Sequence, residues 1–208
     1  MSDVKTNQQT RGRVGNRRRI VRLTAAGLGA ALLAVLAQIA LPIGPVPVTL
    51  QTLSVTLIAA ALPVGTTLLA IVVYILMGLV GLPVFAGFRG GLSVLAGPTG
   101  GYIWGFILQG LIIGGLIACF EYLAAGRDDK PQVRRLGLLI TGIVGGLIGL
   151  TVLYLTGTLQ LSAVLGLTFK EGLALGVIPF ILKDVLSVVL GIFIGLAVRR
   201  ALGRSRLG

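Results

Sequence analysis

The chain has 208 residues, of which 55% are hydrophobic and only 12% are charged, with a formal net charge of +12 and no histidine. This composition excludes an ordinary soluble domain of this length, and the lack of histidine removes the commonest general base and metal ligand. We therefore expect an all-α integral membrane protein that forms one domain.

The basic residues predict an orientation in the membrane. Most of the 18 fall within three short segments, at residues 5–22, 127–135 and 199–206. With six membrane spans, all three segments and both termini lie on one side, which the positive-inside rule makes cytoplasmic. Attraction to anionic membrane lipid is a sufficient role for these charges. Nucleic acid is not an expected partner, because no basic face is interleaved with aromatic residues.

The same pattern divides the chain into three parts. Residues 1–21 are expected to be a basic cytoplasmic tail whose composition favours disorder. Residues 22–201 hold the six-helix transmembrane domain, and residues 202–208 form a second basic tail.

The first predicted span is Arg22–Leu41, and one of its faces carries small side chains four residues apart, at Ala26, Ala30 and Ala34. Small residues at this spacing allow another helix to approach closely. Ordinary packing within the bundle explains the pattern equally well. The proline-rich segment from Pro42 to Pro47 then ends the helix and predicts a rigid outer loop.

Two short spans, Val48–Leu62 and Thr66–Gly81, lead into a loop at Leu82–Gly101 that is rich in glycine and proline and holds Arg89. Lipid offers no hydrogen-bond partners to irregular backbone. We therefore expect this loop to pack against protein or to line a wet cavity on the outer side of the membrane.

The next spans are predicted at Gly100–Leu123 and Leu136–Thr156. The second has glycines four residues apart, which suit close helix contacts: Gly142 with Gly146, and Gly145 with Gly149.

The last third of the chain allows two readings. Thr168 and Glu171 have the spacing of a capping box, which predicts a short helix at Phe169–Ile178. Pro179 interrupts it, so the sixth span is predicted at Ile181–Val198. One kinked helix from Gly172 is the alternative.

Few charged residues lie at membrane depth, where they usually face a cavity or the bundle interior. Lys183 and Asp184 fall in the first turn of the sixth span, at the same outer level as Arg89 and Gln51. Adjacent helical residues point about 100° apart, so Lys183 and Asp184 are not expected to form one face. A structural reading pairs Asp184 with Arg89 to close the fold. A functional reading is a site for a small ligand that carries N–H groups and a carboxylate.

Enzymatic chemistry finds little support. No Gly-Lys-Ser/Thr sequence of a P-loop occurs, and Ser93 and Thr99 lack a histidine to activate them. We expect no catalytic residue, no metal and no resident cofactor.

Three segments together resemble the BioY family, the biotin-binding membrane subunits of energy-coupling factor (ECF) transporters. They are Ile43–Leu53 (IGPVPVTLQTL), Gly81–Gly87 (GLPVFAG) and Leu95–Tyr102 (LAGPTGGY). The resemblance implies a six-helix S-component in a bacterial or archaeal cell membrane, with both termini cytoplasmic. It implies capture of biotin at the outer side and partnership with a transmembrane coupling subunit and two cytoplasmic ATPases.

The resemblance also implies roles for single residues. The face that meets the coupling subunit falls on Ala26, Ala30 and Ala34. The binding residues fall on Thr49, Gln51, Arg89, Tyr102, Lys183 and Asp184. Asp184 suits the ureido N–H groups of biotin, and Arg89 or Lys183 suits its carboxylate. Apolar walls are expected from Phe85, Phe88, Tyr102 and Trp104.

Two other functions stay open at this point. One is an S-component for a different vitamin. The other is a small intramembrane enzyme acting on a lipid or isoprenoid, for which Arg89, Lys183 and Asp184 are the only candidate groups.

Overall fold

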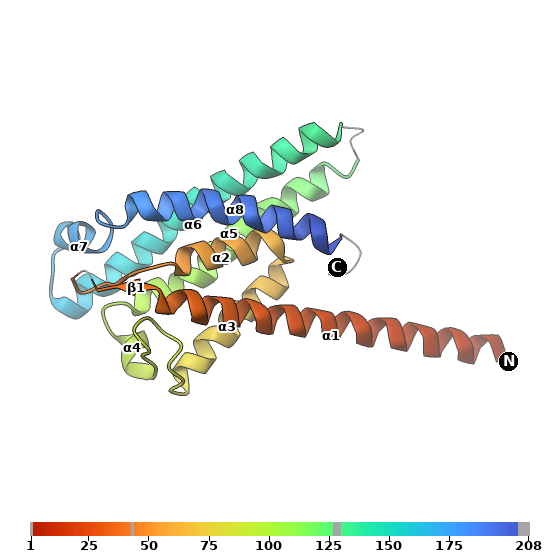
Figure 1. Cartoon of the computed structure of the whole chain (residues 1–208), viewed down its shortest axis with the longest axis horizontal. Coiled ribbons are helices and arrows are strands. Elements are labelled where there is room, and N and C mark those ends of the chain that lie inside the picture. The colour runs from red at the N-terminus through yellow and green to blue at the C-terminus, as the bar shows by residue number, and fades with distance from the viewer. Residues whose placement is uncertain (1, 43, 127–129, 204–208) are drawn as a thin grey trace.

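The computed structural model describes residues 2–42, 44–126 and 130–203 (Figure 1). Its helices and strands are α1 (Ser2–Gln38), β1 (Ala40–Leu41), β2 (Val48–Thr49), α2 (Gln51–Ala61), α3 (Val64–Leu79), α4 (Leu92–Ala96), α5 (Gly100–Leu123), α6 (Pro131–Leu165), α7 (Phe169–Gly176) and α8 (Ile181–Leu202). The described fold is thus helical apart from one two-residue antiparallel ribbon, in which Ala40 pairs with Thr49.

The bundle has two distinct ends. The ribbon, α4 and α7 lie at one end, and the start of α1, the end of α5, the start of α6 and the end of α8 lie at the other (Figure 1). The described arginines of the segments 134–135 and 199–200 therefore share that second end, and the segment 17–22 in the middle of α1 lies beside the end of α8 there. This is the grouping that the positive-inside rule requires, while the side of the membrane that it faces stays a prediction.

Four helical segments of the described chain are long and apolar enough to cross a membrane: Asn16–Gln38, Gly100–Leu123, Pro131–Leu165 and Ile181–Leu202. The apolar helices α2 and α3 are shorter, with 11 and 16 residues. At 1.5 Å per residue, α2 covers only about 16 Å. The structure therefore supports a multi-pass membrane protein, with α2 and α3 as shorter elements inside it.

Helix α1 begins earlier than the sequence suggests. It starts at Ser2, so helix runs through much of the segment whose composition favours disorder. No proline occurs between Ser2 and Gln38, and a helix that has already formed lengthens readily. The division of the chain into tail and domain stays a prediction.

Glycines of α6 bring two neighbouring helices into close contact, as their spacing predicts. A Cβ added at Gly142 or Gly146 would lie within 2.8 Å of Ile192 or Val188 of α8, respectively. Gly145 and Gly149 lie against α5, where an added Cβ would come within 3.2 Å of a side chain. Helix α6 therefore packs between α5 and α8 through two glycine faces.

The two-helix reading of the last third is confirmed. The Thr168 side chain accepts from the Glu171 backbone N–H, and the Glu171 carboxylate accepts from the Thr168 backbone N–H at 2.8 Å, which completes the capping box. Hydrogen bonds from the Thr168 hydroxyl and backbone hold the pKa of Glu171 below its usual value. Helix α7 ends at Gly176, and α8 begins separately at Ile181.

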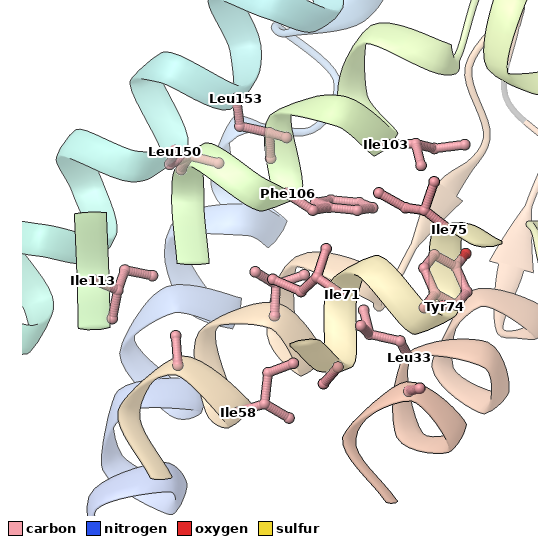
Figure 2. Close-up of a cluster of buried hydrophobic side chains, with 14 of the residues drawn as sticks. Leu33, Ile58, Ile71, Tyr74, Ile75, Ile103, Phe106, Ile113, Leu150 and Leu153 are labelled. Carbon is pink, nitrogen blue, oxygen red and sulfur yellow. The ribbon is translucent and has the colours of Figure 1, made fainter. Parts of the chain in front are cut away.

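The apolar core lies where α1, α2, α3, α5, α6 and α8 meet (Figure 2). Ile75 of α3 lies beside Phe106 of α5, and Tyr74 lies near Leu33 of α1 (Figure 2). Leu33, Ile71 and Tyr74 are fully buried. Phe106 belongs both to this core and to the lining of the cavity described below. The core thus forms the floor on which the candidate site rests.

The contact between α2 and α8 provides a test of the packing. In Gly195→Ala the new Cβ would lie 2.5 Å from the backbone oxygen of Leu57, which has little freedom to move. Overpacking of this kind costs about 1–3 kcal/mol, so we expect a lower thermal unfolding midpoint in detergent. The matched control is Gly115→Ala in α5, where an added Cβ meets nothing within 4 Å. Equal midpoints for the two variants would show that α2 and α8 do not pack as described.

Candidate functional site

A cavity lies at the end of the bundle that carries α4, α7 and the ribbon. It is bounded by the loop at residues 82–101 and by α2, α5, α6 and α8. All seven residues that the sequence nominates for binding line it: Thr49, Gln51, Phe85, Arg89, Tyr102, Lys183 and Asp184. The cavity volume is about 60 Å³, which holds a few water molecules and is well below the roughly 300 Å³ of the smaller ligand pockets.

Asp184 is the buried charge of the site, with 4% of its surface exposed. Its Oδ2 accepts a hydrogen bond of 2.8 Å from the Tyr154 hydroxyl, and its Oδ1 forms an ion pair with Lys183. Asp184 also lies in the first turn of α8, where the helix dipole favours a negative charge. These contacts give the buried carboxylate the hydrogen-bond and charge partners that a buried charge requires.

The ion pair between Lys183 and Asp184 corrects an expectation. Adjacent residues on a helix were expected to diverge, but the flexible four-carbon stem of lysine bends back to its neighbour. The Lys183 ammonium also donates to the backbone oxygen of Thr49 at 2.6 Å, and so ties α8 to β2. Arg89, which the structural reading paired with Asp184, instead donates from Nε to the Ala86 oxygen at 3.1 Å.

Arg89 stands at the mouth of the cavity on a tight hairpin. The backbones of Phe85 and Arg89 exchange two hydrogen bonds, of 2.9 and 3.3 Å. The turn between them has positive φ at Gly87 and Phe88, a conformation for which glycine is suited and phenylalanine is rare. Within the described part of the chain Arg89 has no ion-pair partner, so its guanidinium is available to an anion.

The amide of Gln51 is held in a fixed orientation at the cavity wall. Its oxygen accepts from the Thr49 hydroxyl at 3.0 Å, and its nitrogen donates to the Tyr74 hydroxyl at 2.7 Å. The Tyr74 ring in turn meets Phe85 edge to face, with ring centroids 5.4 Å apart. Polar and aromatic groups of the wall are therefore positioned together.

Two of the four aromatic residues expected as apolar walls lie in the lining of the cavity. Phe85 and Tyr102 line the cavity, and the Tyr102 hydroxyl donates to the Gly176 oxygen at 2.9 Å. Phe88 and Trp104 do not line it: they are 71% and 44% exposed. Phe88 faces outward because it sits at the tip of the hairpin, and Trp104 lies on the exposed side of α5.

The loop at 82–101 is held by glutamines from two other helices. Gln38 of α1 donates to the oxygens of Val84 and Phe85, each at 3.2 Å, and accepts from the Phe88 backbone N–H at 2.9 Å. Gln160 of α6 donates to the oxygens of Leu95 and Gly97, each at 2.8 Å. The loop thus has protein partners for its backbone, as irregular chain at membrane depth requires.

Sequence reasoning missed Tyr154, the residue that positions Asp184. The signal was present, because Tyr154 lies near the outer end of a predicted span that is otherwise apolar and rich in glycine. A tyrosine hydroxyl inside a membrane bundle needs a polar partner, and Asp184 is the acid at the same depth. Phe106 and Phe180 also line the cavity and were not singled out.

The alanines nominated for a partner interface face inward in this chain. Ala26 and Ala30 are 2% and 1% exposed and belong to the core, and Ala34 is partly buried. Contact with another protein through these residues stays a prediction. Among the residues of α1 from 16 to 38, Gly27 and Ala31 are small, exposed and four residues apart.

The site offers one buried acceptor, one anchored ammonium and one accessible guanidinium within aromatic walls. In the described ranges, no group of three or more histidine, cysteine, aspartate or glutamate side chains is placed to hold a metal ion. The arrangement suits recognition of a small polar molecule with an apolar body and an anionic group.

Comparisons with known proteins identify a family and several relatives of this chain. A sequence model described as the BioY family matches residues 7–204. The chain is 37% identical to the biotin transporter BioY2 of Lactococcus lactis subsp. cremoris over 90% of this chain and 94% of that protein. It is 36% identical to the biotin transporter BioY of Thermotoga maritima over 86% of this chain and 96% of that protein.

A solved structure shares the fold. The S-component for biotin from an ECF-type ABC transporter superposes with a TM-score of 0.73 at 24% identity, over 89% of this chain and 94% of that one. The family match covers nearly the whole chain, and two full-length relatives exceed a third in identity. The chain therefore belongs to the BioY family.

Proposed function

We propose that this chain binds biotin as the substrate-binding membrane subunit of a vitamin uptake transporter. The observation that carries the proposal is the cavity that joins the buried Asp184 carboxylate, aromatic walls and the Arg89 guanidinium, which forms no ion pair with any described residue. The relatives named as biotin transporters support the choice of vitamin. The proposed role is transport without catalysis by this chain.

The contacts of the site suggest how the vitamin lies. The ureido ring of biotin has two N–H donors and one carbonyl acceptor, and Asp184 is the buried acceptor that suits the donors. Phe85 and Tyr102 provide walls for the thioether ring and the stem. Lys183 is already bound to Asp184 and Thr49, so Arg89 is the proposed partner of the biotin carboxylate.

The small volume of the cavity implies that it widens on binding. At about 60 Å³ it is too small for a molecule with two fused rings. The hydrogen bond from Lys183 to Thr49 joins α8 to the ribbon on either side of the space. We propose that the entering vitamin breaks this bond and frees Lys183 to contact the ligand.

The wider architecture is part of the same proposal. We propose six membrane-crossing helices, with α2 and α3 as the short ones, in the cell membrane of a bacterium or archaeon. Both termini then lie in the cytoplasm, with the shared basic end of the bundle. The proposed partners are a transmembrane coupling subunit and two cytoplasmic ATPases, which supply the energy.

The coupling subunit is expected to contact α1. Beside α1 runs an apolar groove of about 490 Å³, which α2 and α8 complete on the other side. Gly27 and Ala31 on the exposed side of α1 would allow a partner helix to approach closely. Contact through Ala26 and Ala30 would first require α1 to separate from the core, because both are buried.

Titration of the purified chain with labelled vitamins tests the proposal directly. We expect saturable binding of biotin and at least a hundredfold weaker binding of thiamine and riboflavin, which lack a cyclic urea joined to a carboxylate stem. Preference for thiamine or riboflavin would assign the fold to another vitamin. Turnover of a lipid by the purified chain would indicate an enzyme instead.

Loss of either charged group is expected to weaken biotin binding. Asp184→Asn and Arg89→Ala should each raise the Kd more than tenfold, about 1.4 kcal/mol, because each removes a charge-assisted hydrogen bond. Isothermal titration with biotin measures the change. Lys170→Ala is the matched control, because Lys170 is an exposed cation outside the cavity lining. Near-native affinity in both site variants would refute the site and leave the family membership intact.

Tyr154→Phe tests whether the hydroxyl acts by positioning Asp184. Loss of its 2.8 Å hydrogen bond should raise the biotin Kd about tenfold, as expected for a bond to a charged group. Combined with Asp184→Asn, the two effects should be clearly less than additive. Tyr122→Phe, at an 82% exposed tyrosine, is the control. Additive losses would mean that Tyr154 acts independently of Asp184.

A further inference from the structure

A second cavity lies at the opposite end of the bundle from the candidate site. It has a volume of about 360 Å³ and is formed by the end of α5, the start of α6 and the end of α8. Its lining consists of Glu121, Pro131, Arg134, Arg135, Leu138, Leu196, Arg199 and Arg200. Four arginines and one glutamate thus surround a space within the size range of small-molecule sites.

One arginine of this cavity is occupied within the protein. Arg199 forms an ion pair of 2.6 Å with Glu121 and donates to the Ala60 oxygen at 3.3 Å. This pair uses the one carboxylate among the described lining residues. It also fixes the end of α8 against α5 and α2.

The other three arginines are not paired in this way. Arg134, Arg135 and Arg200 have no ion pair with any residue that the structure describes. The Nε of Arg134 is buried and lacks a hydrogen-bond acceptor in those ranges. A buried donor without a partner is costly, so an oxygen ligand in this cavity would satisfy it.

The lining also indicates the kind of ligand. Guanidinium groups bind phosphate through paired hydrogen bonds, so three arginines that form no ion pair with the described residues suit a phosphate group. Leu138 and Leu196 provide apolar surface deeper in the bundle, suited to acyl chains. No aromatic side chain belongs to the described lining, so the cavity has no stacking surface for a nucleotide base.

We infer that this cavity binds the headgroup of one anionic phospholipid. Its phosphate contacts Arg134, Arg135 and Arg200, and its chains pass along Leu138 and Leu196. Basic pockets between helices at this end of a membrane protein commonly hold such headgroups. The inference concerns residues remote from the vitamin cavity and does not depend on the proposed substrate.

Native mass spectrometry of the full chain in neutral detergent tests the inference. We expect one phosphatidylglycerol to be retained per protein, at a lipid concentration about tenfold or more below that needed for phosphatidylcholine. Arg134→Gln combined with Arg135→Gln should lower the affinity for phosphatidylglycerol about tenfold, or 1.4 kcal/mol. The matched control is Arg18→Gln with Arg19→Gln, which removes the same charge from exposed residues of α1.

The thermal unfolding midpoints of both double variants show whether they are folded. If the variant with Arg134→Gln and Arg135→Gln does not fold, the single variant Arg200→Gln takes its place. The control should retain phosphatidylglycerol within about twofold of the unchanged chain. Equal losses in the two variants would overturn the inference in favour of diffuse charge attraction. Equal binding of phosphatidylcholine, or displacement of the lipid by equimolar inorganic phosphate, would also overturn it.

Discussion

The structure depends on supplying hydrogen-bond partners to irregular backbone inside an apolar bundle. The loop at 82–101 meets this requirement through Gln38 and Gln160, whose amides reach it from α1 and α6. An unsatisfied backbone group in hydrocarbon costs several kcal/mol. These two side chains therefore allow a hairpin and a short helix to exist where lipid alone would permit only regular helix, and they create the wall that holds Phe85 and Arg89.

A small network of charges sets the character of the cavity. Asp184 is neutralised by Lys183 and positioned by Tyr154, while Lys183 is held by Thr49. Burying these charges is tolerated because each has a partner. Removing one partner would leave a buried charge without compensation, which is strongly destabilising. Arg89 lies outside this network. The site therefore holds the Lys183–Asp184 ion pair in its interior and the positive charge of Arg89 at its mouth. This distribution of charge suits a ligand with a neutral polar group at one end and an anionic group at the other.

Local patterns in the sequence predicted a large part of this arrangement. The capping box and the positions of the helices depend on neighbours along the chain, and a helix is observed at each predicted span, although only four of the described helices are long and apolar enough to cross a membrane. The spacing of the glycines in α6 also predicted close helix contacts, which are observed with α5 and α8. The co-location of the nominated site residues followed from the family resemblance. The directions of Phe88 and Trp104, the bend of Lys183 toward Asp184 and the role of Tyr154 were not foreseen. Each depends on how distant segments pack, which periodicity and spacing do not encode.

The hydrogen bonds of Gln38 to the hairpin have a mechanical consequence. Its amide sits at the last residue of α1 and holds the hairpin from both sides, so that hairpin and helix end move as one body. A rigid rod converts a small tilt at its far end into a displacement at its tip. A tilt of α1 would therefore also displace the hairpin that carries Phe85 and Arg89 at the rim of the candidate site.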